Sequence, residues 1–203
     1  MNILSRQQLY TIYGDVAPHA FALTEDEKEL VRKYEKKWEK QALNGEPMKR
    51  DVVVKALRDL FRIKGIKDEK TGAVKEPNVV FVEDPTHLIP AVQKAFDAAG
   101  FIEQKAESFR DHITMGRFEG SWLSFRDFLQ QERGIKSVDD SLIDLMYEIG
   151  TSLIFDDIQV ISEPPSQILL DDQFRPHSEE GPAILWPNGY CKYVVHGKEI
   201  IVE

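Results

Sequence analysis

The chain has 203 residues, of which 42% are hydrophobic, enough to bury the core of one domain or of two small ones. Its 26 basic and 35 acidic side chains give a formal net charge of −9, which argues against a general nucleic-acid coat or a binder of anionic membranes. The single cysteine, Cys191, excludes an intramolecular disulfide and any zinc site built from several cysteines.

The sequence predicts neither a targeting segment nor a membrane segment. No stretch approaches the roughly 18 apolar residues of a membrane span. Residues 1–13 lack the basic start and the apolar run of a secretory signal. A lone cysteine fits a reducing compartment. We therefore expect a cytoplasmic protein with no membrane partner.

The negative charge is concentrated in the last third of the chain. Residues 24–76 carry a net charge of about +3, whereas residues 137–203 carry about −10. Such asymmetry is typical of two surfaces with different partners, although solvated helix faces and acidic turns explain it more simply.

The first half of the chain predicts three helices and one strand. Thr24 and Glu27 have the spacing of a capping box, and an apolar stripe of helical period follows them. Asp84-Pro85 is typical of a helix start and Gly100 of a helix end. The predicted elements are two antiparallel helices over residues 24–42 and 49–63, a loop over 64–76, a buried strand over 78–82 and a helix over 85–99.

The pattern stays helical to residue 153 and then changes to strands. Phe125 and Phe128 lie at core spacing, which favours a hydrophobic core over a cofactor site. Asn188-Gly189 predicts a hairpin with a type I′ turn, and His196-Gly197 predicts a second turn. The predicted helices cover residues 101–115, 122–133 and 140–153, and the predicted strands cover 157–162, 167–170, 183–186, 190–195 and 199–202.

These elements predict an α+β fold, in which a helical body with a short inserted strand is closed by a C-terminal antiparallel β-meander. We expect residues 1–155 to form the mainly helical body. Residues 156–203 are expected to form the meander, packed on the body within one compact domain.

The densest polar cluster lies in the predicted meander. Its turns contain Gly181-Pro182 and Asn188-Gly189, beside carboxylates that can accept backbone N–H groups and a histidine, His177, that can donate to a strand carbonyl. A purely structural hairpin therefore explains every residue of the cluster. The candidate functional residues are Asp171, His177, Glu179, Glu180 and His196.

This cluster resembles the H-x-E-D/E-G-P-A hairpin of an uncharacterised bacterial and phage domain family. Here the motif stands once, as His177-Ser178-Glu179-Glu180-Gly181-Pro182-Ala183. Leu23-Thr24-Glu25-Asp26-Glu27 and Phe125-Arg126-Asp127-Phe128-Leu129 are also similar to the longer members, as are residues 78–82 with Asp84-Pro85. The resemblance implies a fold for most of residues 23–203 and no established activity.

The first functional hypothesis is a non-enzymatic module that presents the acidic C-terminal hairpin surface to another protein. It is favoured because no catalytic signature is complete. A deaminase needs a Pro-Cys-x-x-Cys partner for its metal, and Ser178 lacks the G-x-S-x-G elbow of a nucleophile. Cys191 lies in a predicted strand, and the sequence has no P-loop and no G-x-G-x-x-G. We expect no cofactor.

Two alternatives remain open. A metal-assisted hydrolase would use His177 and Glu179 with Asp171 and His196, since imidazoles and carboxylates suit magnesium, manganese or zinc, although their spacing matches no signature. Weak nucleic-acid binding by the first helix is the third hypothesis, in which interleaved glutamates reduce the basic field. Its candidate residues are Lys33, Lys36, Lys37 and Lys40.

Overall fold

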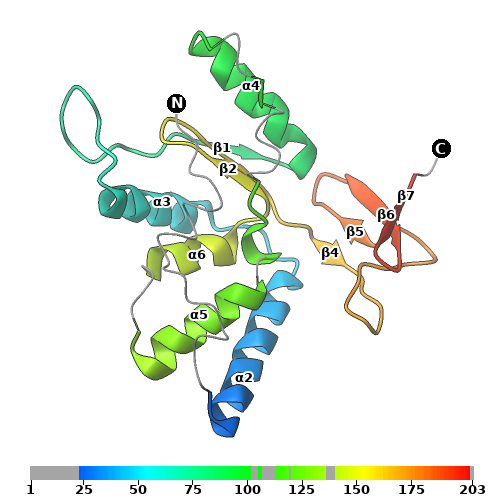
Figure 1. Ribbon diagram of the computed structural model, residues 1–203. Coiled ribbons are helices and arrows are strands. Elements are labelled where there is room, and N and C mark those ends of the chain that lie inside the picture. Colours follow the sequence, from blue (N-terminus) through cyan, green and yellow to red (C-terminus); the bar gives the residue numbers. More distant parts are fainter. Residues whose placement is uncertain (1–22, 102–104, 107–112, 119, 136–139, 202–203) are drawn as a thin grey trace.

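The computed structural model describes residues 23–101, 105–106, 113–118, 120–135 and 140–201 (Figure 1). It confirms the predicted α+β class. None of the helices among the described residues is long and apolar enough to cross a membrane. The helical elements are α2 (Glu25–Ala42), α3 (Arg50–Lys64), η2 (Pro85–His87), α4 (Leu88–Ala98), η4 (Gly116–Phe118), α5 (Gly120–Arg133) and α6 (Asp140–Glu148); the strands are β1 (Val79–Val82), β2 (Ser152–Ile154), β3 (Gln159–Ser162), β4 (Gln167–Ile168), β5 (Ile184–Leu185), β6 (Cys191–Val195) and β7 (Lys198–Ile200).

Helix α2 begins with the predicted capping box. The Thr24 hydroxyl accepts the Glu27 backbone N–H at 3.2 Å, and the Glu27 carboxylate accepts the Thr24 N–H at 2.8 Å. The predicted pairing of this helix with the next one is wrong, because α2 packs mainly against α5 and α3 packs against α6. The apolar stripe of α2 meets aromatic residues far along the chain, as in the edge-to-face contact of Tyr34 with Phe128. Periodicity shows which face is buried but not which helix covers it.

A three-stranded sheet lies between two groups of helices. Its order is β1-β3-β2, with β3 parallel to β1 and antiparallel to β2. Figure 1 shows α4 on one side of the sheet and α3 with α6 on the other. Because successive strand side chains point to opposite faces, Val79 and Phe81 pack into the core beside α3 and α6, whereas Val80 and Val82 pack into the core beside α4.

Two predicted helices are wrong at their C-terminal ends, where the chain forms strand β2 and its bridge to Thr114. The helix predicted over residues 140–153 ends at Glu148, and the helix predicted over 101–115 has an extended end, where Thr114 forms a β-bridge with Ser152. Gly150 permits this change of direction, since a Cβ there would lie 2.8 Å from the Glu163 carbonyl oxygen. Residues 102–104 and 107–112 of the second predicted helix lie outside the described residues.

The C-terminal sheet is the predicted antiparallel meander, in the order β4-β5-β6-β7. The predicted strand over residues 157–162 does not belong to it, because β3 pairs with β1 and β2. In Figure 1 the meander stands beside the body and is joined to it through the segment before β4. The meander therefore presents one face toward the end of α2.

The predicted type I′ turn at Asn188-Gly189 is wrong. Only Gly189 has a positive φ, of 88°, and the Trp186 carbonyl accepts the Gly189 N–H at 3.0 Å while the Trp186 N–H donates to Tyr190 at 2.8 Å. This is a three-residue loop, in which a type I turn precedes a left-handed glycine. Pro187 favours it because proline fixes φ near −65°, as the second position of a type I turn requires. The two positive φ values of a type I′ turn occur instead at His196 (48°) and Gly197 (78°).

Candidate functional site

Asp171 is the centre of the predicted polar cluster. Its carboxylate accepts the backbone N–H groups of Gln173 at 2.9 Å and Arg175 at 3.0 Å, and Oδ2 also accepts the Arg175 guanidinium at 2.7 Å. The same Oδ2 lies 2.9 Å from Nδ1 of His196. The hydrogen bonds from Arg175 and His196 hold the pKa of Asp171 well below its ordinary value. Asp171 therefore ties the loop after β4 to the turn between β6 and β7.

The two histidines of the cluster stack on each other. Their ring centroids are 4.2 Å apart with an interplanar angle of 11°. His177 accepts a hydrogen bond at Nδ1, to which the backbone N–H of His196 donates at 3.2 Å. Three residues each place one possible metal-ligand atom within 4.8 Å of the other two: His177, Glu179 and His196. Glu180 does not belong to this group.

This geometry favours a structural role over a metal centre. At His196 the contact with Asp171 leaves Nε2 available, as in metal sites where a carboxylate orients the imidazole. His177 is different, because a neutral ring whose Nδ1 accepts a backbone N–H carries its proton on Nε2 and has no free lone pair. Two nearly parallel imidazoles also cannot both place one ion in their ring planes. The cluster fits a clamp on the hairpin better than a hydrolytic metal site.

Replacing Asp171 by asparagine is expected to lower the melting temperature at neutral pH and to leave it nearly unchanged at strongly acidic pH. A carboxylate with a depressed folded-state pKa stabilises the fold above its unfolded pKa of about 3.9, and this contribution is lost as the pH falls toward the folded-state value. Thermal unfolding of both proteins between about pH 2 and pH 7 measures the effect. The exposed neighbour provides the control variant, Asp172→Asn. Parallel curves for the wild type and Asp171→Asn would contradict this role.

The four candidate lysines of α2 are all exposed, but they do not act as a uniform basic surface. Lys37 Nζ donates to the buried carboxylate of Asp127 at 2.6 Å and lies 5.8 Å from the ring centroids of Tyr34 and Tyr147. Lys37 therefore contributes to the packing of α2 on α5. Glu35 and Glu39 lie among the other three lysines along the helix, as expected from the sequence. Lys33, Lys36 and Lys40 remain exposed on the same helix.

A cleft that the sequence did not predict lies between the body and the meander. Its volume is about 840 Å³, within the usual range for ligand sites. The body wall comes from the second half of α2 and from η4, and the meander wall comes from β4, β5 and the loop between them. The lining is mainly apolar and includes Trp38, Ala42, Leu43, Met115, Phe118, Ile168, Leu170, Phe174, Ile184 and Trp186.

The Asp171 loop holds an aromatic side chain at this cleft. Phe174 lines the cleft, is 68% exposed and has a φ of 58°, a left-handed conformation that a bulky residue rarely adopts. Its backbone N–H donates to the Asp171 carbonyl at 3.0 Å, and the residues on both sides of it donate to the Asp171 carboxylate. The predicted cluster thus acts on the cleft indirectly, by fixing the loop that carries Phe174.

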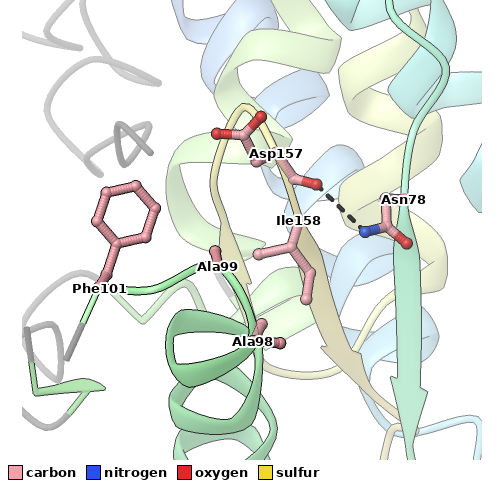
Figure 2. A pocket seen from close by; sticks show the side chains of 7 residues that line it. Asn78, Ala98, Ala99, Phe101, Asp157 and Ile158 are labelled. Carbon is pink, nitrogen blue, oxygen red and sulfur yellow. Dashed lines mark hydrogen bonds between the residues drawn. The ribbon is translucent and has the colours of Figure 1, made fainter.

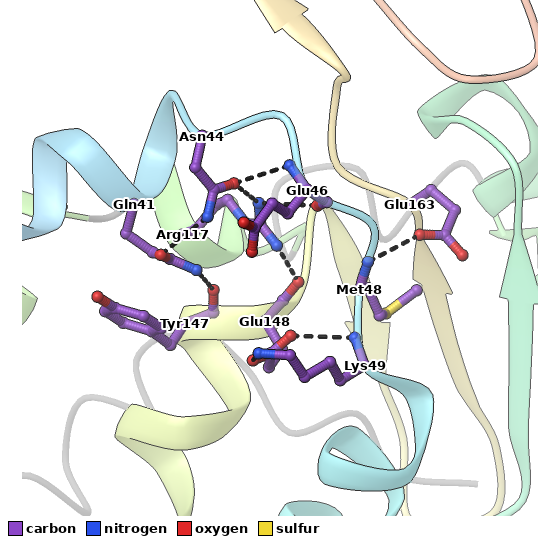
Figure 3. A network of polar contacts seen from close by, with 9 residues as sticks. All are labelled: Gln41, Asn44, Glu46, Met48, Lys49, Arg117, Tyr147, Glu148 and Glu163. Atoms are coloured by element: carbon purple, nitrogen blue, oxygen red, sulfur yellow. Dashed lines mark hydrogen bonds and ion pairs between the residues drawn. The ribbon is translucent and has the colours of Figure 1, made fainter.

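Two buried polar atoms of the cleft lining have no hydrogen-bond partner. They are Nε1 of Trp186, which is 6% exposed, and Nε of Arg117, which is 1% exposed. The other Arg117 nitrogens donate to the Asn44 side-chain oxygen at 3.0 Å and to the Glu148 carbonyl at 2.6 Å (Figure 3). Burial lowers the pKa of Arg117. Both orphaned atoms are N–H donors, so each can bind an acceptor.

The meander wall is anchored to the body by Asn188. Its amide Nδ2 donates to Oδ2 of the buried Asp84 at 2.6 Å. Gly45, just after α2, allows a close approach at the other end, because a Cβ there would lie 2.3 Å from the carbonyl oxygen of Ser166. These two contacts set the separation of the cleft walls.

A second hollow, of about 500 Å³, lies at the end of α4 (Figure 2). Asn78 closes one side of it, with its Nδ2 3.3 Å from the Asp157 carbonyl oxygen, and the Asp157 carboxylate binds Lys75. None of the orphaned polar atoms found among the described residues belongs to its lining. This hollow therefore offers less chemistry to a ligand than the cleft does.

No family model matches the chain, and neither a curated protein nor a solved structure matches it. The likeness of its hairpin to the bacterial and phage family therefore stays a prediction.

Proposed function

We propose that this protein is a non-enzymatic protein-interaction module that binds an apolar segment of a partner protein in the cleft between α2 and the meander. The observation that carries the proposal is the size of this mainly apolar cleft, with Phe174 exposed at it. Large apolar surfaces open to solvent mark interaction sites in folded proteins. The proposal retains the binding role expected for the acidic C-terminal region and assigns it to the inner face of the meander.

The cleft lining supports binding better than nucleophilic catalysis. Among the described residues that line it there is no histidine, cysteine or serine. Its aromatic side chains, Trp38, Phe118, Phe174 and Trp186, are of the type that dominates the energetic centre of protein interfaces. The acidic side chains Glu179 and Glu180 are exposed in the loop between β4 and β5 and can steer a basic partner surface.

A matched pair of variants tests the proposal. Leu170 lines the cleft, whereas Leu169 does not and is exposed, since neighbouring residues of an extended segment point to opposite faces. A random dodecapeptide library displayed on phage is selected against the immobilised protein, and the selected peptides are titrated by fluorescence anisotropy. We expect Leu170→Glu to weaken binding at least about tenfold, because a charge is buried against an apolar ligand. Leu169→Glu is expected to bind as the wild type does.

Two results would contradict the proposal. One is a selection that yields no peptide binding to the folded wild type. The other is equal weakening by Leu169→Glu and Leu170→Glu, which would place the binding surface elsewhere or report a general loss of structure. Circular dichroism of each variant separates these two causes of equal weakening.

A further inference from the structure

The two cations of the cleft lining already have carboxylates beside them. On the meander wall, Lys192 Nζ forms an ion pair with Glu199 at 2.9 Å. On the body wall, the buried guanidinium of Arg117 is attracted by three carboxylates, those of Glu46, Glu148 and Glu163. Among the lining residues that the structure describes, neither positive charge is therefore left without an opposite charge.

The two carboxylates of the lining, Glu35 and Glu39 on α2, have no such partner. Both residues are exposed, and neither side chain forms a hydrogen bond or an ion pair in the part of the chain that the structure describes. Arg32 and Lys36 lie three residues before them on the helix, but they do not line the cleft and pair with neither carboxylate. Because like charges four residues apart on a helix repel each other, this pair gains from a cation bound beside it.

Apolar side chains adjoin both carboxylates on the same wall of the cleft. Trp38 follows Glu35 by three residues and Ala42 follows Glu39 by three, so each carboxylate shares a helix face with an apolar lining residue. The side chain of lysine or arginine suits such a border, since its methylene stem covers apolar surface while its charged end reaches a carboxylate. The lining therefore favours an occupant that combines an apolar anchor with a basic side chain.

We propose that the partner segment bound in this cleft is amphipathic and places a lysine or arginine side chain, next to its apolar anchor, against Glu35 and Glu39. This inference rests on the proposed function and specifies the chemistry of the partner. Apolar contacts supply most of the buried area, whereas the ion pairs distinguish basic segments from other apolar segments. The formal net charge of −9 favours the approach of the same kind of partner.

Three dyes built on one apolar core test the inference without knowledge of the partner. Diphenylhexatriene is uncharged, its trimethylammonium derivative is cationic and its propionic acid derivative is anionic, and all three become fluorescent in an apolar site. At low ionic strength we expect the wild type to bind the cationic dye about fivefold more tightly than the uncharged dye, and the anionic dye more weakly than either. Salt at about 0.5 M is expected to remove most of this preference, because exposed ion pairs are screened.

Two substitutions remove the carboxylates one at a time. Glu35→Gln and Glu39→Gln each keep the length of an exposed side chain, and circular dichroism checks that the fold is kept. We expect each to lower the preference for the cationic dye about twofold and the double variant to abolish it, while the affinity for the uncharged dye stays unchanged. The matched control is Glu29→Gln, since Glu29 is exposed on the same helix, does not line the cleft and alters the net charge equally. It is expected to keep the wild-type preference.

The peptides selected on phage extend the test to a protein segment. Replacement of each lysine and arginine of a selected peptide by glutamine is expected to weaken binding to the wild type at one position by about threefold. The same replacement is expected to have little effect on binding to the double variant of Glu35 and Glu39, because the partner of the basic side chain is already absent. Equal weakening with both proteins would show that the basic side chain binds elsewhere and would contradict the inference.

The dye experiments separate the two proposals. The inference about the basic side chain would be overturned by equal binding of the cationic and uncharged dyes to the wild type, or by a preference that Glu29→Gln lowers as much as Glu39→Gln does. Either result would leave the cleft as an apolar site. Binding of the uncharged dye that Leu170→Glu does not weaken would instead count against the cleft itself.

Discussion

Replacing Gly116 by alanine is expected to destabilise the protein by about 3–4 kcal/mol. Gly116 has a φ of 54°, and a Cβ there would lie 2.1 Å from the Gly150 carbonyl oxygen and 2.3 Å from that of Ile149. Both neighbours are main-chain atoms, so the clash cannot be relieved by rotating a side chain. For a chain of this size such a loss lowers the melting temperature by roughly 10 °C, which differential scanning calorimetry measures.

Gly134→Ala is the matched control. Gly134 ends α5 with a similar φ of 63°, but no atom lies within 4 Å of a Cβ at this position. Gly134→Ala is therefore expected to destabilise the protein only through backbone strain, by about 1 kcal/mol. The difference between the two variants isolates the close approach of η4 to the turn after α6, which also positions Arg117 for the cleft. Equal melting temperatures for the two variants would contradict that approach.

The parts of the fold that the sequence predicted correctly depend on neighbours in the chain. The capping box of Thr24 and the helix start at Asp84-Pro85 each involve only a few consecutive residues. The meander was predictable for the same reason, since short apolar runs alternate with turn residues. Local chemistry also placed the turn at Pro187-Asn188-Gly189. Its type was predicted wrongly because the prediction used Asn188-Gly189 alone and not Pro187, which favours a type I turn.

The parts that were predicted wrongly depend on residues far apart in sequence. Gly150 is a local signal that the helix predicted over 140–153 can stop, but it does not show that a strand follows. Ser152 becomes part of a strand because it pairs with Ile161 on one side and bridges to Thr114 on the other. The partner of α2 is likewise decided by packing across the whole body. Such contacts override helical periodicity, which is a local preference.

The candidate site was predictable only in part. The motif brought Asp171, His177, Glu179 and His196 together because they flank neighbouring turns of one small sheet. The cleft could not be predicted because its walls combine five regions that are far apart in the sequence, namely residues 35–43, 85, 115–118, 151 and 165–192. The available signals were Phe174, a large aromatic residue within a polar run, and Trp186, which ends a short apolar run. An orphaned N–H group has no signature in a sequence.

Replacing Asp84 by alanine is expected to destabilise the protein by about 3 kcal/mol and to loosen the meander from the body. The buried carboxylate caps η2 by accepting the Thr86 N–H at 2.8 Å and its hydroxyl, and it also accepts the Asn188 amide at 2.6 Å. All three donors lose their acceptor in the variant. Chemical denaturation measures the free energy of unfolding. The affinity for the uncharged apolar dye N-phenyl-1-naphthylamine reports whether the apolar cleft is intact.

The effect of Asp84 has a defined pH dependence. Burial by itself would raise the pKa of Asp84, but the hydrogen bonds from Thr86 and Asn188 outweigh burial and lower the pKa below its ordinary value. The stabilisation is therefore present above the unfolded pKa of about 3.9 and is lost as the pH falls below it. The difference in stability between wild type and Asp84→Ala is expected to shrink accordingly in acid.

Two further variants show which bond joins the sheet to the body. Asn188→Ala removes the contact between the meander and Asp84, together with a longer one to Glu83 and the side-chain acceptor of the Tyr190 N–H, but it leaves the cap of η2. We therefore expect it to weaken dye binding as Asp84→Ala does while costing less stability. His87→Ala removes an exposed ion-pair partner of Asp84 and is expected to change neither property. Dye binding by Asn188→Ala as tight as that of the wild type would contradict this role of Asn188. The close approach of Gly45 to Ser166 would then be the contact that holds the cleft walls together.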